Sequence, residues 1–305
     1  MTEYVVKTLG LTKIYSDKAA ISNMDIHIKK GDIYGLIGKN GAGKTTLLRI
    51  ITGLAAPTRG QVELFSKKAE LNTMRRRLGC IIEMPALYPN MTASENLEHH
   101  RRLLGIPNRS SVEDVLEIVR LKDTGKKKVK DFSLGMKQRL GIAMALLGNP
   151  DFLILDEPIN GLDPIGIIEI RELLLRLNHD NGITVLISSH ILGEITKLVT
   201  CYGIINNGEL VDEFTARELE ERCKKFLKIR VNDVKKACLL LETVIGSTNY
   251  TIQPDNSIRL YELFDKSGII TAEFARNNVS VEEITAEGQD LEGYFMGLMG
   301  GVSNV

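Results

Sequence analysis

The chain has 305 residues, enough for one large domain or for a domain with a smaller companion. Its 39 basic residues balance its 39 acidic residues, so net charge predicts no bulk attraction to nucleic acid or to an anionic membrane surface. No apolar run approaches the roughly 20 residues of a membrane-spanning helix. The composition is that of a soluble globular protein, and any membrane crossing is left to another chain.

The cysteines and the first residues bear on the compartment. Cys80, Cys201, Cys223 and Cys238 are scattered and form no CxxC pair, which predicts free thiols in a reducing compartment. The first seven residues lack the basic start and the long apolar region of a signal peptide. We therefore expect a cytoplasmic protein.

The first elements are short strands. Residues 4–36 alternate apolar and polar side chains in short runs, which predicts antiparallel strands. Tyr15 lies among them, and an exposed aromatic ring at this point could stack on a purine. An ordinary strand tyrosine fits the same pattern.

A glycine-rich segment, Gly38–Thr46, follows the predicted strand 33–37. It has a glycine, four residues and then Gly-Lys-Thr, which is the pattern of a phosphate-binding loop. Leu47, Leu48, Ile50, Ile51 and Leu54 then recur at helical spacing. Glycines let the backbone wrap a phosphate and point free N–H groups at it. Lys44 supplies a positive charge for the phosphates, and Thr45 offers a hydroxyl to Mg²⁺.

A strand and a helical region come next. Thr58–Leu64 reads as a turn into a strand, and Cys80–Glu83 reads as a strand that ends at a carboxylate. Thr92 with Glu95 three residues later forms a capping-box pattern at the start of a helix. Helical spacing continues to about residue 147, which predicts an α-helical subdomain over residues 87–147 within an α/β domain.

A second anion-binding pattern closes this region. Ser133 and Gly135 precede a helix that carries Leu140, Ala143 and Leu147. A helix N-terminus with a small hydroxyl residue and a glycine suits an anion. A plain helix cap fits equally well.

The apolar run Phe152–Asp156 predicts a strand that is buried on both faces of a parallel sheet. Asp156 and Glu157 follow at its carboxyl end, where such sheets bind ligands. Asp156 can hold Mg²⁺ through water, and Glu157 can orient or deprotonate an attacking water. Structural charges at a strand end are the alternative.

The remaining elements of this domain are a helix, a further buried strand and a hairpin. Asn160–Pro164 predicts a turn before a helix that ends near Leu177, and the strand 183–187 leads to His190. A histidine there could bond a γ-phosphate, although a lone histidine is more often structural. Residues 202–211 read as a hairpin with Asn-Gly at its turn.

The C-terminal part changes character. We place an ATP-binding-type domain at 1–213, a linker helix at 214–225 and an accessory α+β domain at 226–305. The accessory domain has strands and helices in the order β-α-β-β-α-β, which is the order of a ferredoxin-like split unit. These elements are predicted at 226–231, 233–244, 250–253, 258–263, 267–277 and 279–285.

In this order, the motifs between Thr2 and Glu213 resemble the ATP-binding subunit of ABC transporters, a P-loop NTPase fold with a mixed sheet core, an antiparallel β subdomain and an α-helical subdomain. The resemblance implies that two such domains sandwich two ATP molecules, each held by the phosphate loop of one copy and the signature of the other. It assigns ATP contacts to Tyr15, Gly38, Asn40, Gly41, Ala42, Gly43, Lys44, Thr45, Thr46, Ser133, Gly135 and Asp163. It assigns catalysis to Glu157, His190 and Glu83, and Mg²⁺ to Thr45, Asp156 and Glu83.

Two departures from the family pattern matter. Leu134 and Met136 stand where the signature usually has Gly and Gln, and Glu83 stands where the family usually has Gln beside the metal. A surface glutamate in a slipped alignment would also explain Glu83. The Glu variant, the Ser-Leu-Gly-Met signature and the C-terminal extension resemble the branch that exports bacitracin or gives immunity to lantibiotics.

We therefore expect an ATP-hydrolysing subunit on the inner face of the cell membrane. It would power a separate permease that exports a peptide antibiotic, as a homodimer or as a dimer with a related subunit. The alternative is a soluble relative acting on ribosomes or nucleic acid, which one ATP-binding domain and neutral charge disfavour. A nucleotide sensor without turnover is weakened by the presence of both Lys44 and Glu157.

Overall fold

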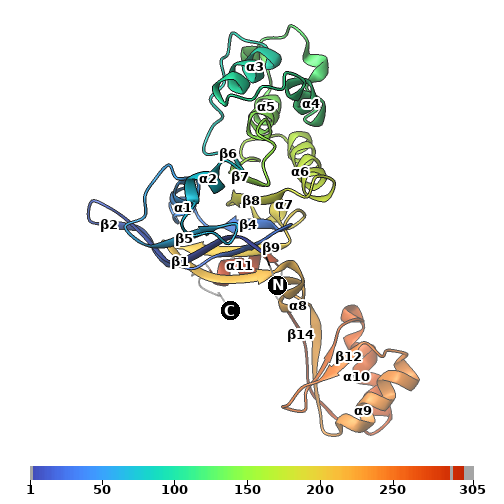
Figure 1. Cartoon of the computed structure of the whole chain (residues 1–305). Coiled ribbons are helices and arrows are strands. Elements are labelled where there is room, and N and C mark those ends of the chain that lie inside the picture. Colours follow the sequence, from blue (N-terminus) through green and yellow to red (C-terminus); the bar gives the residue numbers. More distant parts are fainter. Residues whose placement is uncertain (1–2, 289–290, 299–305) are drawn as a thin grey trace. The chain divides into compact units, whose positions relative to one another are not determined.

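The computed structural model describes residues 3–288 and 291–298 of the chain (Figure 1). Contacts between residues divide the chain into two compact units, and the division falls between Ala216 and Arg217. That point lies within the segment 214–225 that the sequence predicts as a linker. Each unit has its own apolar core.

The first unit is built on a six-stranded sheet with the order β10-β9-β4-β8-β7-β6. Neighbouring strands are parallel except for β10, which pairs antiparallel with β9. Every residue of β4, β7 and β8 is buried, which explains their continuous apolar runs. The strands are β4 (Ile33–Ile37), β6 (Leu78–Ile81), β7 (Phe152–Asp156), β8 (Thr184–Ser189), β9 (Cys201–Asn206) and β10 (Glu209–Thr215).

A second sheet and helix α1 cover this core. In the second sheet β1 pairs antiparallel with β2 and β3, as predicted from the alternation in residues 4–36, and also with β5. One apolar cluster joins this sheet, α1 and strands β4, β7 and β8. The elements are β1 (Tyr4–Tyr15), β2 (Lys18–Met24), β3 (His27–Lys29), β5 (Arg59–Leu64), α1 (Lys44–Thr52) and α2 (Leu71–Arg75).

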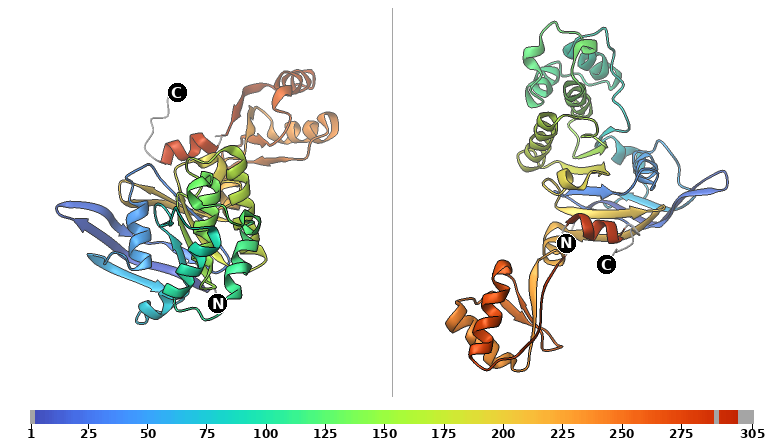
Figure 2. Two further views of the ribbon diagram at one scale, coloured as in Figure 1. Left: turned by 90° about the horizontal axis from the view of Figure 1, so that it is seen from above. Right: turned by 180° about the vertical axis from the view of Figure 1, so that it is seen from behind.

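The predicted helical subdomain is present, on the side of the six-stranded sheet away from β1 and β2 (Figure 2, right). Thr92 and Glu95 form the expected capping box at its first helix, because each side chain bonds the other residue's backbone N–H. Its elements are α3 (Ala93–Leu103), α4 (Ser110–Ile118), the 3₁₀ turns η1 (Lys122–Thr124) and η2 (Val129–Asp131), and α5 (Leu134–Leu146). Two further helices, α6 (Pro164–His179) and α7 (Leu192–Ile195), flank β8 in the sequence.

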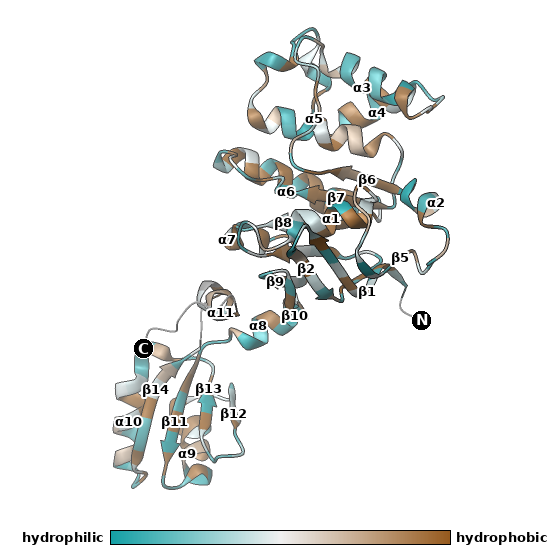
Figure 3. Cartoon of the chain, turned by 90° about the vertical axis from the view of Figure 1, so that its left-hand side faces the viewer, coloured by the Kyte–Doolittle hydropathy of each residue, from teal (hydrophilic) through white to brown (hydrophobic). Residues whose placement is uncertain are grey.

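The second unit has a four-stranded sheet with the order β12-β13-β11-β14, antiparallel throughout. Its elements follow the predicted order β-α-β-β-α-β, and both apolar and polar residues lie along its strands (Figure 3). The predicted helix 233–244 ends as α-helix at Leu240 and continues as one π turn, and the predicted strand 258–263 ends at Leu260. The elements are α8 (Ala216–Arg222), β11 (Phe226–Val231), α9 (Val234–Leu240), η3 (Leu241–Ile245), β12 (Tyr250–Ile252), β13 (Ile258–Leu260), η4 (Phe264–Lys266), α10 (Ser267–Arg276), β14 (Val281–Glu287) and α11 (Leu291–Leu298).

Candidate active site

The glycine-rich loop joins the end of β4 to the start of α1, as the motif predicts. Gly41 and Gly43 have φ angles of 81° and 110°, in the region that favours glycine. A Cβ added at Gly43 would lie 2.7 Å from the carbonyl oxygen of Ala20, and one added at Gly38 would lie 2.4 Å from that of Ile205. The loop therefore needs glycine because neighbouring backbone approaches it closely.

Lys44, the first residue of α1, turns its side chain back into this loop. Its ammonium donates to the carbonyl oxygens of Gly38 at 2.7 Å and Lys39 at 3.3 Å. It also forms an ion pair with Oε1 of Glu157 at 3.1 Å. The buried positive charge is thus held between two loop carbonyls and a carboxylate.

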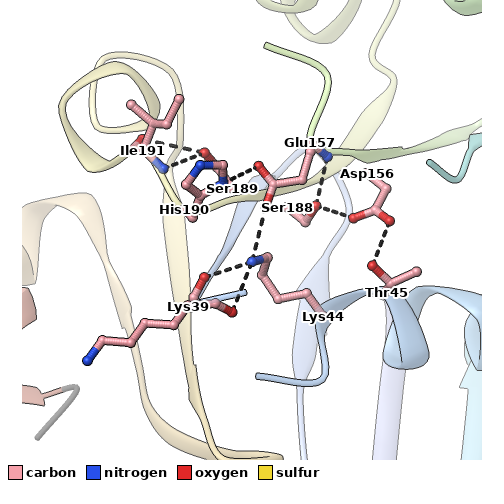
Figure 4. A network of polar contacts seen from close by, with 10 residues as sticks. Lys39, Lys44, Thr45, Asp156, Glu157, Ser188, Ser189, His190 and Ile191 are labelled. Carbon is pink, nitrogen blue, oxygen red and sulfur yellow. Dashed lines mark hydrogen bonds and ion pairs between the residues drawn. The ribbon is translucent and has the colours of Figure 1, made fainter. Parts of the chain in front are cut away.

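Thr45 and Asp156 meet directly (Figure 4). The Thr45 hydroxyl donates to one Asp156 oxygen at 2.8 Å, and the Ser188 hydroxyl donates to the other at 2.6 Å. The backbone N–H of Glu157 in turn donates to the Ser188 oxygen at 2.9 Å. The buried Asp156 carboxylate, at the carboxyl end of β7, is therefore fixed between the hydroxyl of Thr45 on α1 and that of Ser188 on β8.

Glu157 stands at the centre of the cluster (Figure 4). One of its oxygens contacts Lys44, and the other lies 2.8 Å from Nδ1 of His190. Glu157 also has a φ angle of 50°, a left-handed conformation that is uncommon outside glycine. That backbone turn directs its side chain toward Lys44 and His190, so the structure brings together the predicted catalytic carboxylate, lysine and histidine.

A pocket of about 210 Å³ opens between these groups and the glycine-rich loop. A hydroxyl and a carboxylate are hard oxygen donors, so Thr45 and Asp156 suit Mg²⁺, which binds through few protein ligands when phosphate and water supply the rest. Among the described residues, no group of three or more His, Cys, Asp or Glu could hold a metal on its own. The pocket is lined by Ala20, Asn40, Gly41, Gly43, Lys44, Thr45, Thr46 and Glu157.

The other predicted anion-binding turns cap helices. The Ser133 hydroxyl accepts from the N–H of Met136 at 3.3 Å at the start of α5, and the Asp163 carboxylate accepts from the N–H of Gly166 at 3.1 Å at the start of α6. A Cβ added at Gly135 would meet no atom closer than 3.9 Å. Within the described part of the chain, no hydrogen bond joins Ser133 or Asp163 to the phosphate loop.

Tyr15 ends β1, and 44 % of its surface is exposed. The Lys13 ammonium lies 4.9 Å from its ring centroid, which is a cation–π distance. Lys13 is held there by a hydrogen bond to the carbonyl of Ala56 at 2.8 Å. Because Ala20 of the paired strand β2 lines the phosphate pocket, the β1–β2 hairpin borders that pocket.

Comparison with known proteins decides the family. The family model described as ABC transporter matches residues 21–160. Over 98 % of its length the chain is 45 % identical to the bacitracin transport ATP-binding protein BcrA of Enterococcus faecalis, and the match covers 97 % of BcrA. The chain belongs to the ATP-binding proteins of ABC transporters.

Two further comparisons place this ABC protein. It is 43 % identical to the lantibiotic transport ATP-binding protein SrtF of Streptococcus pyogenes, over 68 % of the chain and 90 % of SrtF. A solved dimer of the ATP-binding cassette MJ0796, in a post-hydrolysis state with ADP and Pi, superposes with a TM-score of 0.63 and 29 % identity, over 70 % of this chain and 99 % of that one. The chain is an ABC-type ATPase, and no helix among its described residues is long and apolar enough to cross a membrane.

Glu83 forms an ion pair that this ABC pattern did not predict. Strand β6 ends at Ile81, and Glu83 follows with a left-handed φ angle of 65° and a side chain that is 62 % exposed. Its carboxylate pairs with the guanidinium of Arg49 on α1. Asp156 bonds Thr45 and Ser188, whereas the partner of Glu83 is Arg49, one helical turn beyond Thr45.

A large apolar groove in the ABC unit was missed by the sequence analysis. It has a volume of about 960 Å³ and lies among α3, α5, β6 and the segment after β6. Four of the exposed large apolar side chains of the unit line it: Leu54, Met84, Leu103 and Leu104. Leu54 belongs to the helical spacing predicted after the phosphate loop, but α1 ends at Thr52. No pattern in the sequence groups the four side chains.

Ser188 is the polar residue of the active site whose role was missed. The sequence places it between the predicted strand 183–187 and His190 and gives it no role of its own. Ser188 contacts Asp156 because β7 and β8 are adjacent parallel strands in which these two residues are paired. The sequence does not state which strands are adjacent, so it gives no signal for this contact.

Proposed function

We propose that this ABC protein hydrolyses ATP to power a separate membrane permease that exports a peptide antibiotic or a similar amphipathic compound. The observation that carries the proposal is the match to BcrA, a bacitracin transport protein, over 98 % of the chain. That match covers nearly the whole chain, whereas the match to the lantibiotic protein SrtF covers 68 % of it. The alternative, an ATPase acting on ribosomes or nucleic acid, has no comparable observation in its favour.

The pocket supports hydrolysis by its own side chains. Phosphate oxygens compete with Glu157 for the Lys44 ammonium, so ATP binding would open the ion pair between them. Oε1 of Glu157 is buried, and among the described residues its partner is Lys44, so it would then be free to take a proton from the attacking water. His190, in contact with the other oxygen, would orient the carboxylate and reach the γ-phosphate.

Mg²⁺ is the cofactor that these donors fit. Thr45 and Asp156 would hold it, and the ion would neutralise charge on the phosphate oxygens when bound. The Ser188 hydroxyl keeps Asp156 oriented toward Thr45. Glu83 would join this site only after leaving Arg49.

Two copies would complete the site. We propose that Ser133, Gly135 and Asp163 of one copy bind ATP held by the phosphate loop of the other, with Tyr15 stacking on adenine. The N-terminus of α5, a helix of 13 residues, presents free N–H groups there. The partner is either a second copy of this chain or a related subunit, and the similar cassette MJ0796 is a dimer.

The permease would dock in the apolar groove lined by Leu54, Met84, Leu103 and Leu104. A contiguous exposed apolar surface of this kind marks a protein interaction site. An amphipathic cytoplasmic helix of the permease fits such a groove by laying its apolar face into it. This docking would hold the chain on the inner face of the cell membrane.

The C-terminal unit would be a ferredoxin-like accessory domain at 226–305, joined by a linker helix at 214–225. Across the sheet the strands lie in the order β14, β11, β13, β12. In the chain these are the fourth, first, third and second strands of the unit. Two β-α-β halves that interleave in this way support the ferredoxin-like assignment.

The deciding experiment is a mild-detergent pull-down of the tagged Glu157→Gln chain with ATP present. This change keeps the side-chain shape but removes the base, so the closed ATP-bound state should persist. We expect a multi-spanning permease in near-equal amount. Leu103→Glu in the groove should abolish its recovery, whereas Leu175→Glu, an exposed leucine of α6 outside the groove, should not. Recovery of ribosomes or DNA-bound proteins without a membrane protein would overturn the proposal.

A further inference from the structure

The sheet of the C-terminal unit is covered by its two long helices on one face. Side chains of α9 and α10 join Leu227, Ile229 and Ile258 in one apolar cluster, so both helices lie against the face that carries these residues (Figure 1). Successive side chains of a strand point to opposite faces. Lys228 of β11 and Arg259 of β13 therefore lie on the other, open face, where both are partly exposed.

Two aromatic rings lie together on this open face. Phe226 begins β11 and Tyr261 directly follows β13, and these are the two central strands of the sheet. The ring centroids are 6.2 Å apart and the ring planes meet at 67°, which is an edge-to-face contact. Aromatic rings on the face of a four-stranded sheet are the means by which RNA-recognition domains stack the bases of a single strand.

Each ring lies against a cation that has no acidic partner. The Arg259 guanidinium lies 4.5 Å from the Phe226 centroid, and the Lys224 ammonium lies 4.4 Å from the Tyr261 centroid. In the part of the chain that the structure describes, neither cation has a carboxylate within 4.0 Å or donates a hydrogen bond. The N–H groups of both side chains are thus available to a ligand.

The other cations of the open face are neutralised by strand β14. Lys228 pairs with Glu287 at 3.4 Å, and Arg230 pairs with Glu283 at 4.0 Å. Lys228 also lies directly opposite Arg259 in the register of β11 and β13, and like charges in opposite positions destabilise a sheet. An uncharged residue at position 259 would remove this repulsion, so the stability of the sheet does not explain the arginine.

We propose that the open face binds single-stranded RNA. Bases would stack on the two rings and on the guanidinium plane of Arg259, while Arg259 and Lys224 would donate to phosphate oxygens. The hydroxyls of Thr251 and Tyr261, 3.0 Å apart, would bond the ribose 2′-OH that distinguishes RNA from DNA. This is a further function of the C-terminal unit, and it does not rest on the proposed transport function.

The first test is fluorescence anisotropy of a labelled oligouridine of about eight nucleotides with the purified full-length chain. We expect a Kd of about 1 to 100 µM. The slope of log Kd against log salt should be only about 1 to 2, because about two phosphates are bound. Double-stranded RNA of the same length should bind at least about tenfold more weakly, since its bases are stacked inside the helix. Equal binding of oligodeoxyuridine would overturn the assignment to RNA.

Two variants of the open face test stacking directly. Phe226→Leu keeps an apolar side chain without the ring, and it should weaken RNA binding about tenfold. Arg259→Lys keeps the charge without the guanidinium plane and should weaken it severalfold. The melting temperature of each variant shows whether the unit is folded, and ATP turnover should stay within about twofold of wild type. Unchanged RNA binding by folded Phe226→Leu would overturn the proposal.

A matched pair of charge variants separates the open face from diffuse attraction. Arg259→Gln and Lys235→Gln each remove one positive charge, but Lys235 is an exposed residue of α9, which packs on the opposite face. We expect Arg259→Gln to weaken RNA binding about tenfold and Lys235→Gln to change it less than about twofold. Equal losses would show that RNA responds only to the total charge and would overturn the proposed site.

Two competitors identify where the RNA lies. A non-hydrolysable ATP analogue with Mg²⁺ fills the phosphate loop, and RNA binding should persist in its presence; loss of binding would place the RNA in the ATP site and overturn the proposal. Poly-glutamate should not displace the RNA. Displacement by it at equal charge, together with unchanged poly-glutamate binding by Phe226→Leu, would make the open face a site for acidic peptides instead.

The proposed function is tested separately, by ATP turnover and by recovery of a permease with the Glu157→Gln chain. If RNA does not bind while both of those results are obtained, only the role of the open face is wrong. If RNA binds as expected and no permease is recovered, the transport function is wrong and the RNA site stands.

Discussion

The two units of this protein use strands differently. In the ATPase unit, parallel neighbours place Asp156 beside Ser188 at one edge of the sheet, and the residues that follow, Glu157 and His190, meet at 2.8 Å. In the C-terminal unit every neighbouring pair is antiparallel, and polar side chains pair across the face of the sheet, as Lys228 does with Glu287.

The difference shows what sheet direction does for function. Parallel strands all end at one edge, so the polar residues after them converge on a ligand. Antiparallel strands end alternately at opposite edges, so charges are spread along the face and neutralise one another. We therefore expect changes in the first unit to alter chemistry and changes in the second to alter stability.

The largest effect should follow Gly135→Asp in the ATPase unit. A carboxylate at this turn would face the γ-phosphate bound to the other copy and repel it. We expect kcat to fall about 100-fold or more, with ATP-analogue binding to the single chain changed only a few-fold. Gly148→Asp, at the far end of α5 where an added Cβ meets nothing within 4 Å, is the control. Normal hydrolysis by Gly135→Asp would contradict the signature assignment.

An intermediate effect should separate the units. Ile229→Ala removes a fully buried side chain from the C-terminal core and should lower the free energy of unfolding of that unit by about 3 kcal/mol. ATP turnover should stay within twofold. Leu155→Ala, equally buried but next to Asp156, should lower both stability and kcat, the latter by about tenfold. Calorimetry together with turnover tests the pair, and equal loss of turnover in both variants would erase the comparison.

The smallest effect concerns a polar contact away from the site edge. The hydroxyl of the buried Tyr34 donates to Glu213 at 2.7 Å. Burial, followed by the charge of Glu213, raises the pKa of Tyr34 well above its usual 10.0. The neutral phenol is thus the form that the fold favours, so its contribution is complete below about pH 10 and is lost as the pH rises above that.

Tyr34→Phe should therefore cost about 1 kcal/mol at neutral pH and less as the pH rises above 10. Burial also raises the pKa of Cys201 to about 12, and this alkaline loss is common to both proteins. Melting temperatures at pH 8 and pH 10.5 isolate the tyrosine by difference. A constant gap between the two proteins would show that Tyr34 ionises as freely in the folded chain as in the unfolded one.

The predictions that succeeded rest on short stretches. The glycine-rich loop, the Thr92 capping box and the Asn207-Gly208 turn, with φ angles of 50° and 84°, follow from residues a few positions apart. The order of elements in the C-terminal unit was predicted in the same way. The predicted end of the helix 233–244 differs from the structure, because the π turn that follows α9 keeps the apolar spacing of a helix.

Glu83 shows where such reasoning stops. The resemblance placed it where the family has a glutamine beside the metal, but its partner is Arg49 on α1. The sequence does not show that Glu83, which is not a glycine, adopts a left-handed backbone conformation. It also does not show a salt bridge between residues 34 positions apart. Its role in catalysis stays a prediction.

By itself the sequence determined the phosphate loop and the strand that ends at Asp156, because each depends on backbone conformation and chemistry within a few residues, and the order of such motifs determined the family. Only the tertiary structure decided that Ser188 holds Asp156, that Glu83 pairs with Arg49, that four scattered apolar side chains line one groove, and that Arg259 lies over the ring of Phe226. The reason is physical. These contacts join segments far apart in the chain, and which segments meet is decided by how strands order themselves in a sheet and how helices pack around one core.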